Sequence, residues 1–88
     1  MLKIQRTTDG QRAVFTLSGR IETEQVAEVQ RLFALEAAGV SLVLDLHGVE
    51  LVDREAVRFL ARCEAEGVTL VHCPAYIREW IKREKAQP

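Results

Sequence analysis

The stretch VSLVLDLHGVELVDREAVRFL, residues 40–60, passes from an apolar run to a helical pattern through three consecutive charges. Its first part, VSLVLDL, is typical of a central strand that is buried on both faces of a sheet. Its last part has apolar residues at helical spacing, so that one side of a helix packs on the sheet. Asp53, Arg54 and Glu55 therefore lie at a strand-to-helix junction, where ligands and partners usually meet the sheet of an α/β protein.

On the N-terminal side of this stretch, the pattern predicts a β-hairpin. LKIQR, residues 2–6, and RAVFTLSG, residues 12–19, alternate apolar and polar residues with period two, which indicates half-buried strands. The Asp9-Gly10 pair between them is a preferred two-residue hairpin connection. In the second run, the alternation predicts one face made of Ala13, Phe15 and Leu17.

The spacing of apolar residues predicts three helices and one further strand. The first helix extends over 22–38, with Gly39 as its C-terminal cap and with Val26, Val29, Phe33 and Ala37 facing inward. The second covers about 54–66 and buries Ala56, Val57, Leu60 and Cys63. VTLVHC, residues 68–73, is a fourth strand, and Pro74 starts a last helix with an apolar stripe of Ile77, Trp80 and Ile81. We expect residues 82–88 to fray into solvent, and Tyr76 to lie at the edge of the core.

The resulting order, β-β-α-β-α-β-α, predicts a single α/β domain over residues 1–88. Alternating strands and helices require parallel pairing with right-handed crossovers, and the hairpin adds one antiparallel strand. We therefore expect a small mixed, mostly parallel four-stranded sheet with packed helices.

Composition narrows the classes of function. The 88 residues are 48% apolar and 28% charged with a net charge of −1, which is typical of a globular protein and does not favour nucleic-acid binding. No apolar run approaches the roughly 18 residues that span a bilayer, and the N-terminus has no signal-peptide block, so we expect a cytoplasmic protein without membrane insertion. Cys63, Cys73, His47 and His72 follow no metal-ligand spacing, so we expect free thiols and neither metal nor cofactor.

The junction itself combines helix-stabilising acids with a row of cations. Asp53 is the expected N-cap of the second helix, and Glu55 suits the positive end of the helix dipole. Arg54, Arg58 and Arg62 recur every four residues and form one ridge, with Phe59 at the boundary between the polar and apolar faces. Two interpretations remain open: an ordinary capped helix with a solvated face, or a partner-docking surface in which Phe59 is an apolar anchor.

Two segments together resemble a known family. LVLDLHGVELVDREAVRFLARCEAEGVTLVHCP, residues 42–74, and LSGRIETEQVAEVQRLF, residues 17–33, are similar to the sulfate transporter and anti-sigma factor antagonist (STAS) domain. The resemblance covers about residues 13–85. It implies a non-catalytic interaction module that binds a kinase or anti-sigma factor and is released by phosphorylation of a serine at the start of the second helix.

Transferred residue by residue, the resemblance places Asp45 at the aspartate of the family's L-D-L strand motif. It places Asp53 at the aspartate that precedes the phosphorylated serine. Arg54 and Glu55 then occupy the two Ser/Thr positions, with Glu55 at the phospho-acceptor position and Ala56 in place of glycine. No Ser or Thr occurs between Ser41 and Thr69, so this junction offers a kinase no hydroxyl group. A glutamate provides a fixed charge smaller than the −1.5 to −2 of a phosphoserine, so Glu55 is an imperfect phosphoserine mimic.

Three functions follow as alternatives. The first is a STAS-like regulator that binds a signalling protein through Asp53, Arg54, Glu55, Arg58, Phe59 and Arg62. The second is an accessory subunit of an ABC-type membrane transport complex, docked on an ATPase subunit; a homo-oligomer is compatible with both. The third is an enzyme that uses Asp45, Asp53, His47, His72 and Cys73 near the carboxyl ends of the strands, with the Cys73 thiol activated at a helix N-terminus. The absence of a phosphate loop or nucleophile elbow in the sequence disfavours the third.

Overall fold

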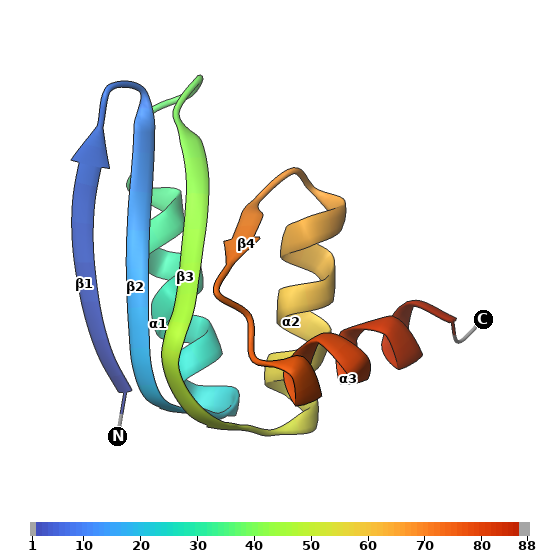
Figure 1. The fold of residues 1–88 in the computed structure, drawn as a ribbon. Coiled ribbons are helices and arrows are strands. Elements are labelled where there is room, and N and C mark those ends of the chain that lie inside the picture. Colours follow the sequence, from blue (N-terminus) through green and yellow to red (C-terminus); the bar gives the residue numbers. More distant parts are fainter. Residues whose placement is uncertain (1, 87–88) are drawn as a thin grey trace.

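The computed structural model describes residues 2–86, which form a four-stranded sheet in the order β1-β2-β3-β4 (Figure 1). β1 (Leu2–Asp9) pairs antiparallel with β2 (Arg12–Ile21), while β3 (Ser41–Val52) and β4 (Thr69–Val71) add in parallel. The helices are α1 (Thr23–Ala34), α2 (Arg54–Ala65) and α3 (Ala75–Ala86). The expected element order and the mixed, mostly parallel sheet are confirmed.

The hairpin forms as the Asp9-Gly10 pair predicts. Asp9 pairs with Arg12, and Gly10 adopts a φ of 64°, a left-handed conformation that glycine takes without steric cost. Ala13, Phe15 and Leu17 are fully buried on the face of β2 that meets the helices, which confirms the predicted alternation.

The core lies between this one face of the sheet and the helices. β3 contributes Leu44 and Leu46, α1 contributes Val26 and Val29, and α2 contributes six side chains: Ala56, Val57, Phe59, Leu60, Ala61 and Cys63. The expectation of a β3 buried on both faces is therefore wrong for most of the strand. Only Val43 is buried on the opposite face, beside its register partners Val14 and Thr69.

β3 continues through HGVELV to Val52, directly before the strand-to-helix junction at Asp53. The β2–β3 register shifts between Thr16 and Ser18 and again between Gly19 and Arg20, so β3 carries extra residues at two bulges. Between them, a Cβ built at Gly48 would lie 2.6 Å from the Ser18 Cβ, so this close approach of two strands requires glycine.

The ends of α1, β4 and α3 differ from the expected ones. α1 stops at Ala34, not at residue 38, and the Glu36 carboxylate beyond it accepts two hydrogen bonds from Arg6 on β1, at 2.7 and 2.8 Å. β4 is only three residues long because His72 turns the chain with a φ of 53°. Residues 82–86 continue α3 as regular helix, whereas residues 87–88, also expected to fray, lie outside the described residues.

α3 buries Ile77 and Ile81 but not the whole predicted stripe. Trp80 is 40% exposed and Tyr76 is 41% exposed, so the expectation that Trp80 belongs to the core is wrong. The two buried isoleucines lie one helical turn apart, whereas Trp80 lies beside Val52 and Val57 in an open groove and stays partly exposed.

Candidate functional site

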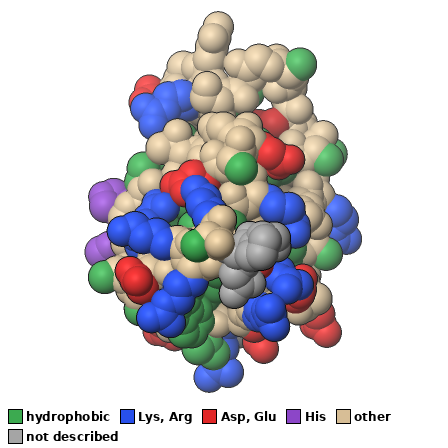
Figure 2. Space-filling model, turned by 90° about the vertical axis from the view of Figure 1, so that its right-hand side faces the viewer, with side chains coloured by type: hydrophobic (Ala, Val, Ile, Leu, Met, Phe, Trp, Pro, Cys, Tyr) green, Lys and Arg blue, Asp and Glu red, His purple; other side chains and the backbone are tan. Residues whose placement is uncertain are grey.

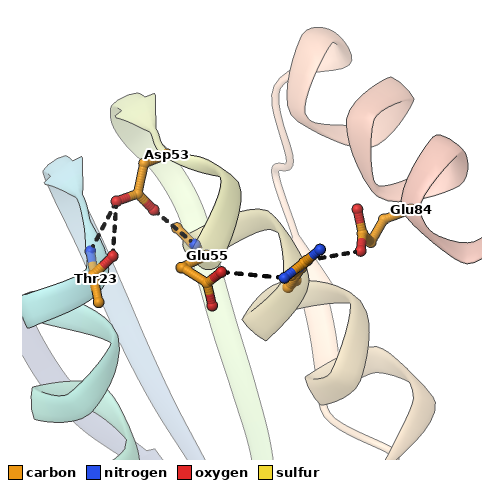
Figure 3. A network of polar contacts seen from close by, with 6 residues as sticks. Thr23, Asp53, Glu55 and Glu84 are labelled. Atoms are coloured by element: carbon orange, nitrogen blue, oxygen red, sulfur yellow. Dashed lines mark hydrogen bonds and ion pairs between the residues drawn. The ribbon is translucent and has the colours of Figure 1, made fainter.

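Asp53 joins the starts of two helices. Its Oδ1 accepts a hydrogen bond from the Ala56 backbone N–H at 2.8 Å, which confirms the predicted N-cap of α2. Its Oδ2 accepts from both the backbone N–H and the hydroxyl of Thr23, at 2.9 and 3.2 Å (Figure 3). One carboxylate therefore satisfies orphan donors at the N-terminus of α1 as well as α2.

This geometry follows from the parallel pairing of β2 and β3. Ile21 and Val52 are register partners at the carboxyl ends of these strands, and the Asp53 N–H donates to the Ile21 carbonyl at 3.1 Å. Because both strands end at one edge of the sheet, the helices that follow them begin side by side.

Sequence reasoning missed Thr23 as part of this junction. The usable signal was the position of Thr23, two residues after the end of β2, a strand predicted to run parallel to β3. A short polar residue at that position lies next to the first residues after the neighbouring strand, here Asp53 after β3.

The charged residues of α2 differ in their exposure and in whether they already form an ion pair. Arg54, Glu55 and Arg62 are exposed, and among residues 2–86 neither Arg54 nor Arg62 has a carboxylate within 4.0 Å. Arg58 is only partly buried, but its guanidinium group is already paired, because its Nε donates to Glu84 on α3 at 3.1 Å and its Nη1 donates to Glu55 at 3.3 Å (Figure 3). The predicted ridge therefore contains two available guanidinium groups and one that ties α2 to α3.

Phe59 does not lie at the boundary of the two faces. Its side chain is 4% exposed, and its ring lies 6.2 Å from that of Phe33, which in turn packs edge-to-face on Phe15 at 5.2 Å. The expectation of an exposed apolar anchor is therefore wrong, because α1 covers this side of α2. We define the α2 surface as Asp53, Arg54, Glu55, Arg58 and Arg62.

The residues considered for catalysis do not form one site. Asp45, His47 and His72 come together: the Asp45 Oδ1 accepts from the His47 backbone N–H at 3.0 Å and lies 3.1 Å from the His72 Nδ1. The two imidazole rings meet edge-to-face, 5.9 Å apart. Asp53 makes its own contacts at the helix starts, and Cys73 contacts the Pro74 carbonyl, with 3.7 Å between Sγ and oxygen.

The surroundings of both cysteines raise the pKa of the thiol group. Both thiols are free, as expected. Burial raises the pKa of Cys63 to about 12, and burial likewise raises the pKa of Cys73 above its ordinary value. The idea that the start of α3 lowers the pKa of Cys73 is therefore wrong, since desolvation of the thiolate outweighs the nearby Arg78 charge.

Within residues 2–86, no three His, Cys, Asp or Glu side chains stand where they could share a metal ion. Over the same residues, no helix has both the length and the apolar character needed to cross a bilayer.

Comparison with known proteins identifies the fold. No family model and no curated protein matches the sequence. Among solved structures, the anti-sigma factor antagonist SpoIIAA in its unphosphorylated form aligns with a TM-score of 0.65 at 14% identity, over 91% of this chain and 82% of that one. An anti-sigma factor antagonist STAS domain from Rhodobacter sphaeroides aligns with a TM-score of 0.61 at 18% identity, over 81% of this chain and 86% of that one.

A third structure places the same arrangement within a larger protein. A protein named Mglu aligns with a TM-score of 0.67 at 24% identity, over 81% of this chain, but the chain spans only 19% of the length of Mglu. Together with the element order and the sheet topology, these alignments show that the chain has the STAS-like fold of SpoIIAA.

Proposed function

We propose that the chain is a non-catalytic, cytoplasmic protein–protein interaction module that docks a partner through the α2 surface. The observation that carries this proposal is the exposed start of α2, with Arg54 and Glu55 projecting from a junction that Asp53 fixes to both neighbouring helices. A rigid base favours docking, because less conformational entropy is lost when the side chains meet a partner. The likeness to anti-sigma factor antagonists supports a binding role and is a likeness of fold.

Glu55 gives the proposed module a permanent charge at the position equivalent to the phospho-acceptor. The Thr23 hydroxyl on α1 is hydrogen-bonded to this junction, where it donates to Asp53. Partner binding therefore depends on the Glu55 carboxylate and not on a switch at this position. Arg58 lies 3.3 Å from that carboxylate and holds it in place.

The first test compares charge reversals on two faces. Tagged wild type, an Arg54→Glu/Arg62→Glu variant and a matched Arg12→Glu/Arg20→Glu variant on β2 are used to capture proteins from the source cell. Arg58 is left unchanged because its reversal would break the contact with Glu84. We expect one partner that wild type and the β2 variant retain and that the α2 variant loses; loss by both variants, or by neither, contradicts the proposal.

The second test concerns Glu55. With the purified partner, Glu55→Gln removes the charge and keeps the shape, while Glu24→Gln in the first turn of α1 is the matched control. We expect Glu55→Gln to change the dissociation constant by about fivefold or more, as loss of a charge at an interface does, and Glu24→Gln to leave it unchanged. If the partner is a kinase, Glu55→Ser becomes a substrate; equal affinity of both glutamine variants contradicts a role for the charge.

A further inference from the structure

A groove between α2 and α3 lies next to the α2 surface. It has a volume of about 350 Å³, and we call it the α2–α3 groove; its lining residues are Val52, Arg54, Val57, Trp80, Arg83 and Glu84. Val52 and Val57 are almost completely buried and form its apolar floor, and the exposed Trp80 is the largest side chain in its wall.

The indole of Trp80 is held in place before any ligand arrives. It packs edge-to-face on Tyr76 one turn earlier, with ring centroids 5.8 Å apart and an interplanar angle of 84°. The Tyr76 hydroxyl donates to the Glu50 carbonyl at 2.7 Å, which ties this pair to β3. A tryptophan that is exposed and also ordered is the side chain most often found at the energetic centre of an interface.

The charge around the groove is positive. Arg54 and Arg83 are exposed, and within residues 2–86 neither has a carboxylate within 4.0 Å. The one acidic lining residue, Glu84, accepts a hydrogen bond from Arg58, so its charge is already matched. Figure 2 shows this side of the molecule, on which Lys and Arg side chains are numerous.

We propose that the α2–α3 groove binds an acidic peptide segment of a partner protein, with one apolar side chain seated on Val52 and Val57 against Trp80 and with carboxylates paired to Arg54 and Arg83. Charge complementarity selects this occupant, because two guanidinium groups that have no carboxylate partner among residues 2–86 flank an apolar floor. The inference deepens the proposed function, since Arg54 belongs to both surfaces, but Trp80 and Arg83 belong to the groove alone.

The test uses a displayed library of random ten-residue peptides, selected on the wild-type protein and counter-selected on a Trp80→Ala variant. We expect enriched peptides to carry several Asp or Glu residues around one Leu, Phe or Trp. No enrichment over the variant, or enrichment of basic or uncharged peptides, overturns the proposal.

Synthetic copies of the enriched peptides are then titrated by the emission of Trp80, the single tryptophan of the chain. For peptides without tryptophan, we expect Arg83→Glu to weaken binding by about tenfold or more at low salt, and Arg12→Glu, on β2, to change it by less than about twofold. Equal effects of the two substitutions overturn the proposal. Circular dichroism confirms that each variant is folded.

Other occupants give different results. If Trp80 emission shifts with protein concentration alone, the occupant is a second copy of this chain. If it shifts with phosphatidylglycerol vesicles but not with peptides, the occupant is a lipid surface. Either result overturns the proposal. Arg62→Glu separates the two proposals, because it changes the α2 surface without touching the groove. If the captured partner is lost with Arg62→Glu but retained with Arg83→Glu and Trp80→Ala, only the groove is refuted.

Discussion

Replacing Asp53 by alanine tests whether one carboxylate holds the two helix starts together. Loss of an ordinary N-cap destabilises a protein by about 1 kcal/mol. Here the same substitution also removes two hydrogen bonds from Thr23, at 2.9 and 3.2 Å, on the other helix. These bonds are exposed, and water can replace them in part, so together they contribute about 1 kcal/mol more. We therefore expect Asp53→Ala to lower the free energy of unfolding by about 2 kcal/mol, a large share of the roughly 5–10 kcal/mol of a small domain.

The assay is urea unfolding of wild type and variant, combined with amide hydrogen exchange. Faster exchange is expected at two backbone amides, Thr23 and Ala56, which lie on different helices. Thr23→Val is the matched control, because it removes only the 3.2 Å bond and should destabilise by about 0.5 kcal/mol. A loss of 1 kcal/mol or less for Asp53→Ala, with unchanged exchange at Thr23, would refute the double cap.

Three further outcomes are expected. The hydrogen bond from Lys85, with help from Arg78, lowers the pKa of Glu64 below 4.5. This carboxylate therefore stabilises the fold above about pH 4.5, and the stabilisation is lost as the pH falls through the lowered pKa. Glu64→Gln should reduce the dependence of the unfolding free energy on pH on the acid side, and an unchanged slope would contradict this. Gly48→Ala should destabilise by about 1–3 kcal/mol, with partial recovery in a Ser18→Gly background, as urea unfolding can show; an undiminished loss in that background would argue against the clash. Cys63 should resist a thiol reagent at pH 8 in the folded state and react after denaturation, since its pKa is about 12; rapid labelling of the native protein would be inconsistent with that burial.

The sequence predicts local structure well where alternating apolar and polar residues flank a recognisable turn. Ala13, Phe15 and Leu17 alternate toward the core as expected, and Asp9-Gly10 makes the hairpin. These features depend on neighbours in sequence, so period-two alternation and turn chemistry are sufficient to predict them.

The aromatic residues show where this approach fails. Phe59 is buried although its helical position lies at the boundary of the apolar face, and Trp80 is exposed although its position belongs to the apolar stripe. A helix pattern predicts which residues share a face, but which other element covers that face depends on the tertiary arrangement. α1 brings Phe33 over Phe59, whereas Trp80 lines the open α2–α3 groove and stays partly exposed.

The candidate site shows the same division. Asp53 was predictable as the cap of α2, because a cap is a contact between residues three positions apart. Its contact with Thr23 spans 30 positions, and the Arg58–Glu84 pair spans 26, so both depend on how strands and helices come together. Binding surfaces are made of such long-range neighbours, and for this reason the α2–α3 groove has no signature in the sequence.

Site-specific photo-crosslinking in the source cell tests the docking surface most directly. A photoreactive phenylalanine analogue is placed at Arg62 on the α2 surface and, as a matched position, at the exposed Arg12 on β2. The account predicts a covalent adduct with one partner protein from position 62 and none with that protein from position 12. Equal yields from both positions, or an adduct from position 12 alone, would contradict docking through the α2 surface.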